Sequence, residues 1–209
     1  DPRVIDLPAV PRWLLLNLII LPFRPRRSAE AYRKIWTEKG SPLLVFDENL
    51  RRELEQRLGL PTALAMRYGE PSIARGLGDL KSRGVDRIVV FSLYPQAASA
   101  SSGTGLEKVY REAGRPWNVP DLVTVPAFFD DPGFIASLEA VGGPVLEDMK
   151  PDHVLFSYHG LPERHIRKAD DSGQHCLGNQ TCCDVLLTVN RNCYRAQCFA
   201  TSRLLARGL

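Results

Sequence analysis

Cysteine is missing from most of this chain. None of the five cysteines among its 209 residues occurs before position 176, and all lie between Cys176 and Cys198. A disulfide framework spreads its cysteines and usually has an even number of them, so the distribution argues against one. We interpret the clustering as a local metal or iron–sulfur site in a reducing compartment, which predicts a cytoplasmic protein.

A strong charge and a long apolar run are missing as well. The formal net charge is only +3 and no Lys/Arg run dominates, so nothing indicates a nucleic-acid partner. The longest apolar run, residues 13–21, is interrupted by Asn17 and closed by Pro22, and it is too short to span a bilayer. The chain opens with Asp1 and no charged-then-apolar leader, from which we expect a processed or incomplete product.

The apolar run has a basic flank, because Arg24, Arg26 and Arg27 follow it closely. A helix of this kind either rests on a membrane surface, here the inner membrane, or rims a site for an acidic ligand. The plainer alternative is a helix packed on the core with its arginines in water. Peripheral membrane contact is therefore one of three interpretations of this segment.

Strand-like and helix-like segments alternate along the chain, which predicts an α/β fold with a parallel sheet covered by helices. Ser28 and Asp47 are the predicted N-caps of two helices, and a third helix is predicted from Ser72, weakened by two glycines. The helix over 132–149 is expected to break near Gly142-Gly143-Pro144. The predicted strands are 62–66, 88–94, 122–125 and 154–156, and the other predicted helices are 28–39, 47–58 and a segment around 106–110.

Polar side chains follow three of the predicted strands. His159 follows residues 154–156, Arg67 and Tyr68 follow residues 62–66, and Tyr94 ends the strand that begins at residue 88. The ends of parallel strands meet at one edge of a sheet, where ligands bind. An imidazole accepts protons or binds metals at neutral pH, and an arginine suits a carboxylate. Taken singly, the three segments are more typical of a carbonyl-bonded histidine, a surface or salt-bridged arginine and a half-buried packing tyrosine.

Four ordered segments carry a more specific signal, and together they resemble the ferrochelatase family, whose members insert ferrous iron into a porphyrin. One departure is that Ala97 and Ala98 stand where the family usually has an aromatic residue and a serine. The segments are Ser28–Trp36 leading to Gly40-Ser41-Pro42-Leu43, Met66-Arg67-Tyr68-Gly69, Leu93-Tyr94-Pro95-Gln96 with its Ser/Gly loop, and Phe156–Pro162.

The resemblance implies two Rossmann-like domains with parallel sheets and a porphyrin cleft between them. Both would be incomplete here: residues 1–96 lack a first strand, and residues 97–209 contain a cysteine-rich insert over 170–198. Because family members extend upstream and downstream, the chain resembles an internal fragment that need not be active alone.

The resemblance also implies an activity, the conversion of protoporphyrin IX and Fe²⁺ to protohaem in haem biosynthesis. His159 would be the ligand of the substrate iron and the proton acceptor, and Arg67 and Tyr68 would line the cleft. The porphyrin-side loop would contribute Tyr94, Ser99 and Ser102. The alternatives are a non-catalytic relative that binds tetrapyrrole or an iron–sulfur cluster, a coproporphyrin-specific enzyme and a cobalt chelatase.

The cysteine spacing suits four thiolates on a [2Fe–2S] cluster or on zinc, and spacing alone does not decide between them. Similarity to bacterial ferrochelatases with internal cysteines implies a [2Fe–2S] cluster. Cys183 is a close alternative to Cys182, His175 is a weaker substitute, and Cys198 by itself would be an ordinary buried helix residue. The implied ligands are Cys176, Cys182, Cys193 and Cys198.

Overall fold

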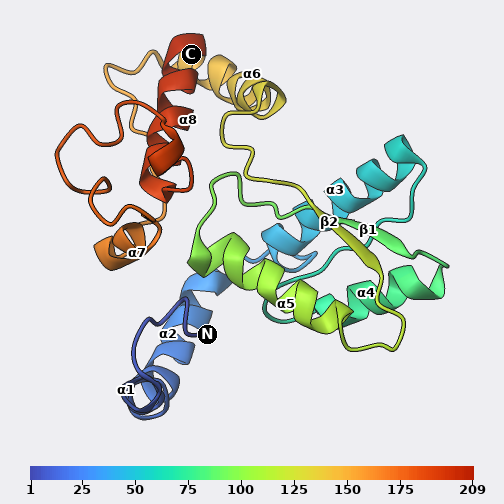
Figure 1. The fold of residues 1–209 in the computed structure, drawn as a ribbon. Helices are drawn as coiled ribbons and strands as arrows, with labels where there is room; N and C mark the ends of the chain where they lie inside the picture. The colour runs from blue at the N-terminus through green and yellow to red at the C-terminus, as the bar shows by residue number, and fades with distance from the viewer. The chain divides into compact units, whose positions relative to one another are not determined.

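The computed structural model describes residues 1–209 and shows a mixed α/β protein (Figure 1). The chain divides into two compact units, each built from two separate stretches of the sequence. Residues 1–90 and 104–123 form the first unit, and residues 91–103 and 124–209 form the second. This division does not test the predicted boundary at residues 96 and 97, which stays a prediction.

The first unit opens with a continuous helical stretch made of α1 (Ala9–Leu14), the π-helical turn η1 (Leu15–Ile20) and α2 (Leu21–Arg33). The predicted helix over 28–39 is therefore wrong at both ends. Ser28 lies inside α2, and a serine caps a helix only where the preceding residue is not already helical. None of the helices of this chain has both the length and the apolar composition that crossing a membrane requires.

The next two helices begin at residues suited to helix starts. α3 (Pro42–Leu58) begins after Ser41 rather than at Asp47, because Pro42 has the fixed φ and the missing N–H that suit a first turn. It ends at Gly59, whose positive φ of 65° favours glycine. α4 (Ile73–Ser82) confirms the helix predicted from Ser72, and the Ser72 hydroxyl caps it by accepting a hydrogen bond from the Arg75 backbone N–H.

A small parallel sheet joins β1 (Arg87–Val90) to β2 (Asp121–Thr124), with the π-helical turn η2 (Ser99–Gly103) and α5 (Thr104–Ala113) between them in the chain. This strand–helix–strand order confirms the α/β alternation over residues 87–124. α4 and α5 pack against each other. The buried apolar side chains of this part are Ile73, Leu80, Ile88 and Ala113.

Two predicted strands are absent. Residues 62–66 form only an isolated bridge between Met66 and Ser72, and residues 154–156 pair with no neighbour, leaving Leu155 86% exposed. β1 also ends at Val90 rather than Tyr94. An apolar run becomes a strand only where a second strand completes its hydrogen-bond ladder. The argument that His159 and Arg67 lie at the ends of sheet strands is therefore wrong.

The second unit is mainly helical and contains α6 (Pro132–Met149), α7 (Glu163–Lys168), the 3₁₀ turn η3 (Thr188–Asn190) and α8 (Tyr194–Gly208). α6 runs through Gly142-Gly143-Pro144, so the predicted break is wrong. Helix packing commonly outweighs weak local propensity, and α6 packs against α8. α8 contacts two of the segments that the sequence singled out, the loop after Tyr94 and the segment around His159.

Candidate functional site

His159 lies on an exposed, irregular segment. Its Nδ1 is 2.9 Å from the Gly160 carbonyl oxygen. A carbonyl only accepts hydrogen bonds, so Nδ1 must carry the proton, and in the neutral ring the lone pair is then on Nε2. The segment therefore presents a free nitrogen lone pair that can accept a proton or bind a metal ion.

α8 holds this segment through two tyrosines. The Tyr194 hydroxyl donates to the His159 carbonyl oxygen at 3.0 Å, and the Tyr158 hydroxyl lies 2.9 Å from the Ser202 hydroxyl. Burial raises the pKa of Tyr194 to about 12 and also raises the pKa of Tyr158. Both phenols therefore stay protonated at neutral pH and can donate these hydrogen bonds.

α8 also holds the loop that follows Tyr94. The Gln96 side-chain amide donates to the Thr201 hydroxyl at 3.0 Å, and the Ala97 backbone N–H donates to Gln197 Oε1 at 2.7 Å. One helix thus brings together two of the predicted site segments, the Tyr94 loop and the His159 segment. Ser99 is exposed, and the Ser102 hydroxyl bonds the backbone of Ala98 within η2.

The predicted pair Arg67 and Tyr68 belongs to the first unit. The Arg67 guanidinium lies 4.5 Å from the centre of the Tyr68 ring. Its Nε donates to the Thr104 carbonyl oxygen at 3.0 Å, and its Nη2 is 2.6 Å from an Asp1 carboxylate oxygen. A substrate carboxylate would have to share or displace these acceptors, and Tyr68 is exposed beside them.

The five cysteines are free thiols, each between 1 and 6% exposed. Four of them share one apolar cluster with Ile166 and Ala196, and the Cys198 thiol instead faces the Tyr194 hydroxyl. Burial is the main cause that raises the pKa of Cys176 and Cys183 to about 12 and that of Cys198 to about 11. The four clustered thiols are Cys176, Cys182, Cys183 and Cys193.

The donor type of this cluster fits a thiolate-bound metal. N–H groups point at two of the sulfurs, from the Leu177 backbone to Cys182 at 3.4 Å and from Arg195 Nη1 to Cys183 at 3.4 Å. Such donors stabilise thiolate ligands. The arrangement of side chains is less complete, since no group of three or more His, Cys, Asp or Glu side chains converges as a metal site.

Two polar side chains that sequence reasoning missed organise the cysteine segment. The Asp170 carboxylate accepts hydrogen bonds from the His175 and Cys176 backbone N–H groups at 2.8 and 2.7 Å. The buried Asn190 amide donates to the carbonyl oxygens of Cys182 and Val185, both at 2.9 Å. A local pattern could have identified Asp170, because an aspartate often accepts a hydrogen bond from the backbone N–H two residues later, here that of Ser172. No local pattern marks Asn190.

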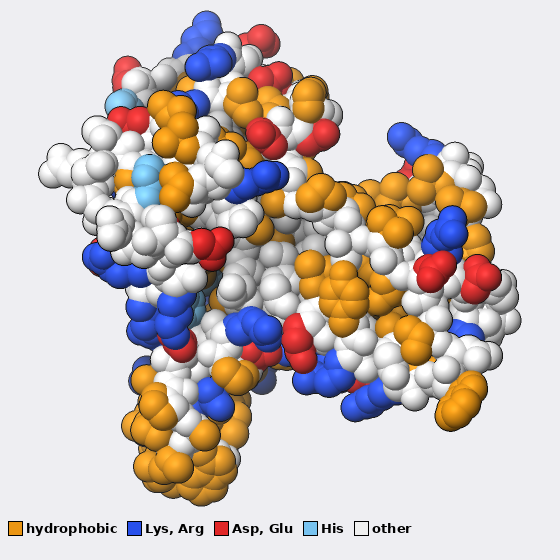
Figure 2. Space-filling view, viewed as in Figure 1, with side chains coloured by type: hydrophobic (Ala, Val, Ile, Leu, Met, Phe, Trp, Pro, Cys, Tyr) orange, Lys and Arg blue, Asp and Glu red, His pale blue; other side chains and the backbone are white.

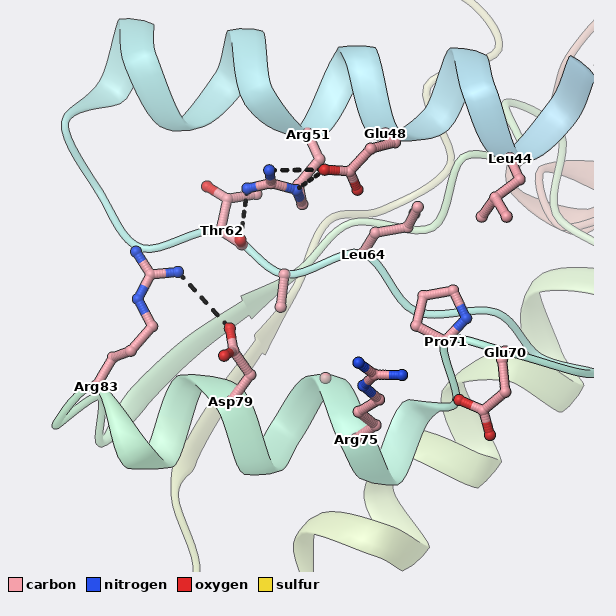
Figure 3. A pocket seen from close by; sticks show the side chains of 12 residues that line it. Leu44, Glu48, Arg51, Thr62, Leu64, Glu70, Pro71, Arg75, Asp79 and Arg83 are labelled. Atoms are coloured by element: carbon pink, nitrogen blue, oxygen red, sulfur yellow. Dashed lines mark hydrogen bonds and ion pairs between the residues drawn. The ribbon is translucent and has the colours of Figure 1, made fainter. Parts of the chain in front are cut away.

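A cavity lies elsewhere in the structure. A space of about 620 Å³ separates α3 from α4 in the first unit (Figure 3). Arg51 lies on its upper wall, bonded to Glu48 and 3.4 Å from the Thr62 carbonyl oxygen, and Arg83 pairs with Asp79 across the lower wall. None of the site residues that the sequence predicts lines this cavity.

The chain is therefore a mixed α/β protein in which one helix, α8, follows a buried thiol cluster and holds the backbone of an exposed histidine. A family model described as Ferrochelatase matches residues 1–209. Proteins named Ferrochelatase from Coxiella burnetii (strain Dugway 5J108-111), Opitutus terrae and Legionella pneumophila (strain Corby) are 42, 46 and 44% identical, over 99–100% of this chain. The chain belongs to the ferrochelatase family.

The chain spans only part of these relatives. It covers 58% of the Coxiella protein, 60% of the Opitutus protein and 61% of the Legionella protein. The resemblance that four sequence segments indicated is confirmed by these comparisons.

Proposed function

We propose that this chain forms part of an enzyme that inserts Fe²⁺ into a porphyrin, protoporphyrin IX in the first instance, to give protohaem. The observation that carries the proposal is the free Nε2 lone pair of His159 on an exposed segment. Family membership over residues 1–209 narrows the chemistry to metal insertion. We propose that residues 1–96 and 97–209 belong to two Rossmann-like domains, and the division of the chain into two compact units supports a two-domain organisation.

His159 would act on the two pyrrole N–H protons that must leave before the iron is bound. The Gly160 carbonyl fixes the Nδ1–H tautomer, so Nε2 is the atom that accepts a pyrrole proton or binds the incoming Fe²⁺. The hydrogen bond from Tyr194 to the His159 carbonyl holds the backbone of this residue. Each insertion releases two protons and leaves the charge of the iron unchanged, so no electron acceptor is needed.

The other predicted residues would bind the macrocycle. Arg67 is proposed to hold a propionate, supported by the hydrogen bond that its Nη2 already makes to an Asp1 carboxylate oxygen. Tyr68 and Tyr94 present exposed rings that can stack on a porphyrin face. Ser99 and Ser102 belong to the turn η2, whose position on α8 is set by Gln96 and Ala97.

The cysteine segment is proposed to bind a [2Fe–2S] cluster. Burial of all five thiols and the N–H groups aimed at the sulfurs of Cys182 and Cys183 support this proposal. When bound, the cluster would cross-link the residues that ligate it, and metal insertion would require no redox chemistry from it. Cys183 stays the alternative to Cys182, because both thiols lie in the same apolar cluster. The proposed ligands are Cys176, Cys182, Cys193 and Cys198.

The N-terminal helical stretch is proposed to contact the surface of an anionic membrane, at the cytoplasmic face of the inner membrane. Figure 2 shows hydrophobic side chains gathered around the α1 end of the molecule. Trp13 and Phe23 are 60 and 71% exposed there, and Leu18 and Ile19 are exposed between them. The exposed Arg24, Arg26 and Arg27 follow directly and suit anionic headgroups.

The test uses the full-length gene product, purified without oxygen. Zn²⁺ or Fe²⁺ insertion into protoporphyrin IX is followed by absorbance for the wild type, His159→Ala and His153→Ala, an exposed histidine in the same segment as the matched control. We expect His159→Ala to lower the insertion rate 10²- to 10⁴-fold, the usual range for a proton acceptor, with His153→Ala near wild type. Equal rates for the two variants would contradict the role of His159. A folded wild-type protein that binds porphyrin without inserting metal would favour the non-catalytic alternative.

A further inference from the structure

Gln197 connects two segments that the proposed function keeps separate. Its Oε1 accepts the Ala97 backbone N–H at 2.7 Å, and its Nε2 donates to the Arg191 carbonyl oxygen at 2.7 Å. The side chain is 1% exposed, so water cannot replace either partner. Ala97 belongs to the loop after Tyr94, whereas Arg191 lies in the cysteine segment between Asn190 and Cys193.

Both ends of this connection are held by further hydrogen bonds. Beside Ala97, the Gln96 side chain bonds the Thr201 hydroxyl, which donates to the Phe129 carbonyl oxygen at 2.7 Å. Beside Arg191, the Cys193 backbone N–H donates to the Asn190 carbonyl oxygen at 2.9 Å. If the cysteine segment moves at Arg191, it must therefore either break its hydrogen bond to Gln197 or pull on the Gln197 hydrogen bond to Ala97.

A second contact runs in parallel from the same turn of α8. Tyr194 follows Cys193 directly and donates its hydroxyl proton to the His159 carbonyl oxygen. The first turn of α8 thus reaches the two segments that the proposed function assigns to substrate. Both contacts begin within four residues of Cys193, which begins the helix as its N-cap residue.

We propose that Gln197 is a positioning residue that couples the cysteine segment to the substrate-side loop at Ala97. A buried amide that is satisfied on both sides cannot release one partner without leaving a buried polar group unpaired. The two segments must then open together. Tyr194 makes the equivalent connection to His159. That the loop at Ala97 faces the substrate rests on the proposed function, whereas the coupling between the two segments does not.

Coupling of this kind is reciprocal. If a group bound by the cysteine segment holds Arg191 in place, it also holds Ala97, and a ligand on the loop strengthens binding at the cysteines by the same factor. This gives the cysteine segment a role in a reaction that transfers no electrons, namely to keep the substrate-side loop in one conformation.

The first experiment needs no substitution. Backbone amide hydrogen exchange of the 209-residue chain is measured by NMR at increasing, sub-denaturing urea concentrations. We expect the Ala97 N–H and the Cys193 N–H to exchange through the same opening, with equal free energies and equal urea dependence. An Ala97 N–H that exchanges through a smaller opening, while the Cys193 N–H stays protected, would overturn the proposal.

The second experiment is a double-mutant cycle on the exchange rate of the Ala97 N–H. Asn190→Ala perturbs the cysteine segment, and Gln197→Met removes both hydrogen bonds with little change in volume. With Gln197 present, Asn190→Ala should speed Ala97 exchange by about tenfold or more. In the Gln197→Met background it should add less than about twofold. Ser202→Ala, further along α8 and bonded to Tyr158 rather than to the loop, is the control and should leave the effect of Asn190→Ala intact.

The same effect of Asn190→Ala in the presence and absence of Gln197 would overturn the coupling. If Gln197→Met does not fold, the urea experiment on the wild type still decides. The readout is also independent of catalysis. If the protein inserts no metal but passes both tests, the proposed function is contradicted and the coupling stands. If the enzyme is active but fails both tests, only the coupling is contradicted.

Discussion

Replacing Asp170 with asparagine should open the cysteine segment. One carboxylate oxygen accepts from the Ser172 N–H at 3.0 Å and hydroxyl at 2.6 Å, and the other accepts from His175 and Cys176. An asparagine has the same shape but only one accepting oxygen. Whichever way its amide turns, two donors then face an NH₂ group that cannot accept them.

The size of the effect follows from the number of bonds lost. A hydrogen bond to a charged group changes an opening equilibrium by about ten- to hundredfold, and two are lost here in one network. We therefore expect iodoacetamide to modify Cys176 about 100-fold faster in Asp170→Asn than in the wild type, measured on the native protein by peptide mass spectrometry. Cys176 is protected by burial in the wild type.

Asp171→Asn is the control for this prediction, because it removes the same charge from the next residue, which is exposed. It should leave the Cys176 rate within about threefold of the wild type. If the two variants react at similar rates, the Asp170 carboxylate does not hold the loop and the reasoning is refuted.

The pH dependence of the wild type gives an independent check. Hydrogen bonds from Ser172, then from the Cys176 backbone, lower the pKa of Asp170 to about 2 from its usual 3.8. Because the folded pKa is the lower one, the contribution of Asp170 is complete above about pH 4 and is lost as the pH falls towards 2. Protection of the Cys176 amide, corrected for intrinsic exchange, should fall over that range in the wild type and stay unchanged in Asp170→Asn.

Three further predictions concern other parts of the chain. Burial raises the pKa of Asp47, so Asp47→Asn should raise the free energy of unfolding at pH 7 and have no effect below pH 4. The hydrogen bond to Arg51 lowers the pKa of Glu48, so Glu48→Gln should lower the free energy of unfolding at pH 7 by up to about 1 kcal/mol. Urea titration measures both changes. Cys182→Ser should abolish the charge-transfer bands of the anaerobically purified protein and Cys183→Ser should keep them; the reverse result assigns the fourth ligand to Cys183. Trp13→Ala should weaken sedimentation with phosphatidylglycerol vesicles by roughly tenfold, and binding equal to the wild type would exclude the N-terminal helix as the contact.

Local signals predicted the elements that depend on a few neighbouring residues. The helix that begins after Ser72 has its cap in the sequence, because the Ser72 hydroxyl and the Arg75 N–H are three residues apart. The two strands that pair around α5 are likewise short β-branched runs on either side of a helix. The order of four motifs identified the family, which the comparisons confirm.

The same signals failed where the answer lay at a distance in the chain. Residues 154–156 have strand composition, but composition does not supply the neighbouring strand that a ladder needs. Residues 132–149 contain a Gly-Gly-Pro sequence typical of a break, yet packing of α6 against α8 keeps the helix continuous.

By itself, the sequence determined which chemical groups this protein has: a histidine after an apolar run, an Arg-Tyr pair, and five cysteines within one segment. The tertiary structure decided which of these groups are held by the same helix, α8. Gln197 and Ala97 are 100 residues apart and meet because α8 is folded against the loop. The His159 carbonyl meets Tyr194 for the same reason, at a separation of 35 residues. Such partners leave no periodic or local pattern, because a hydrogen bond depends on distance in space and not on position along the chain.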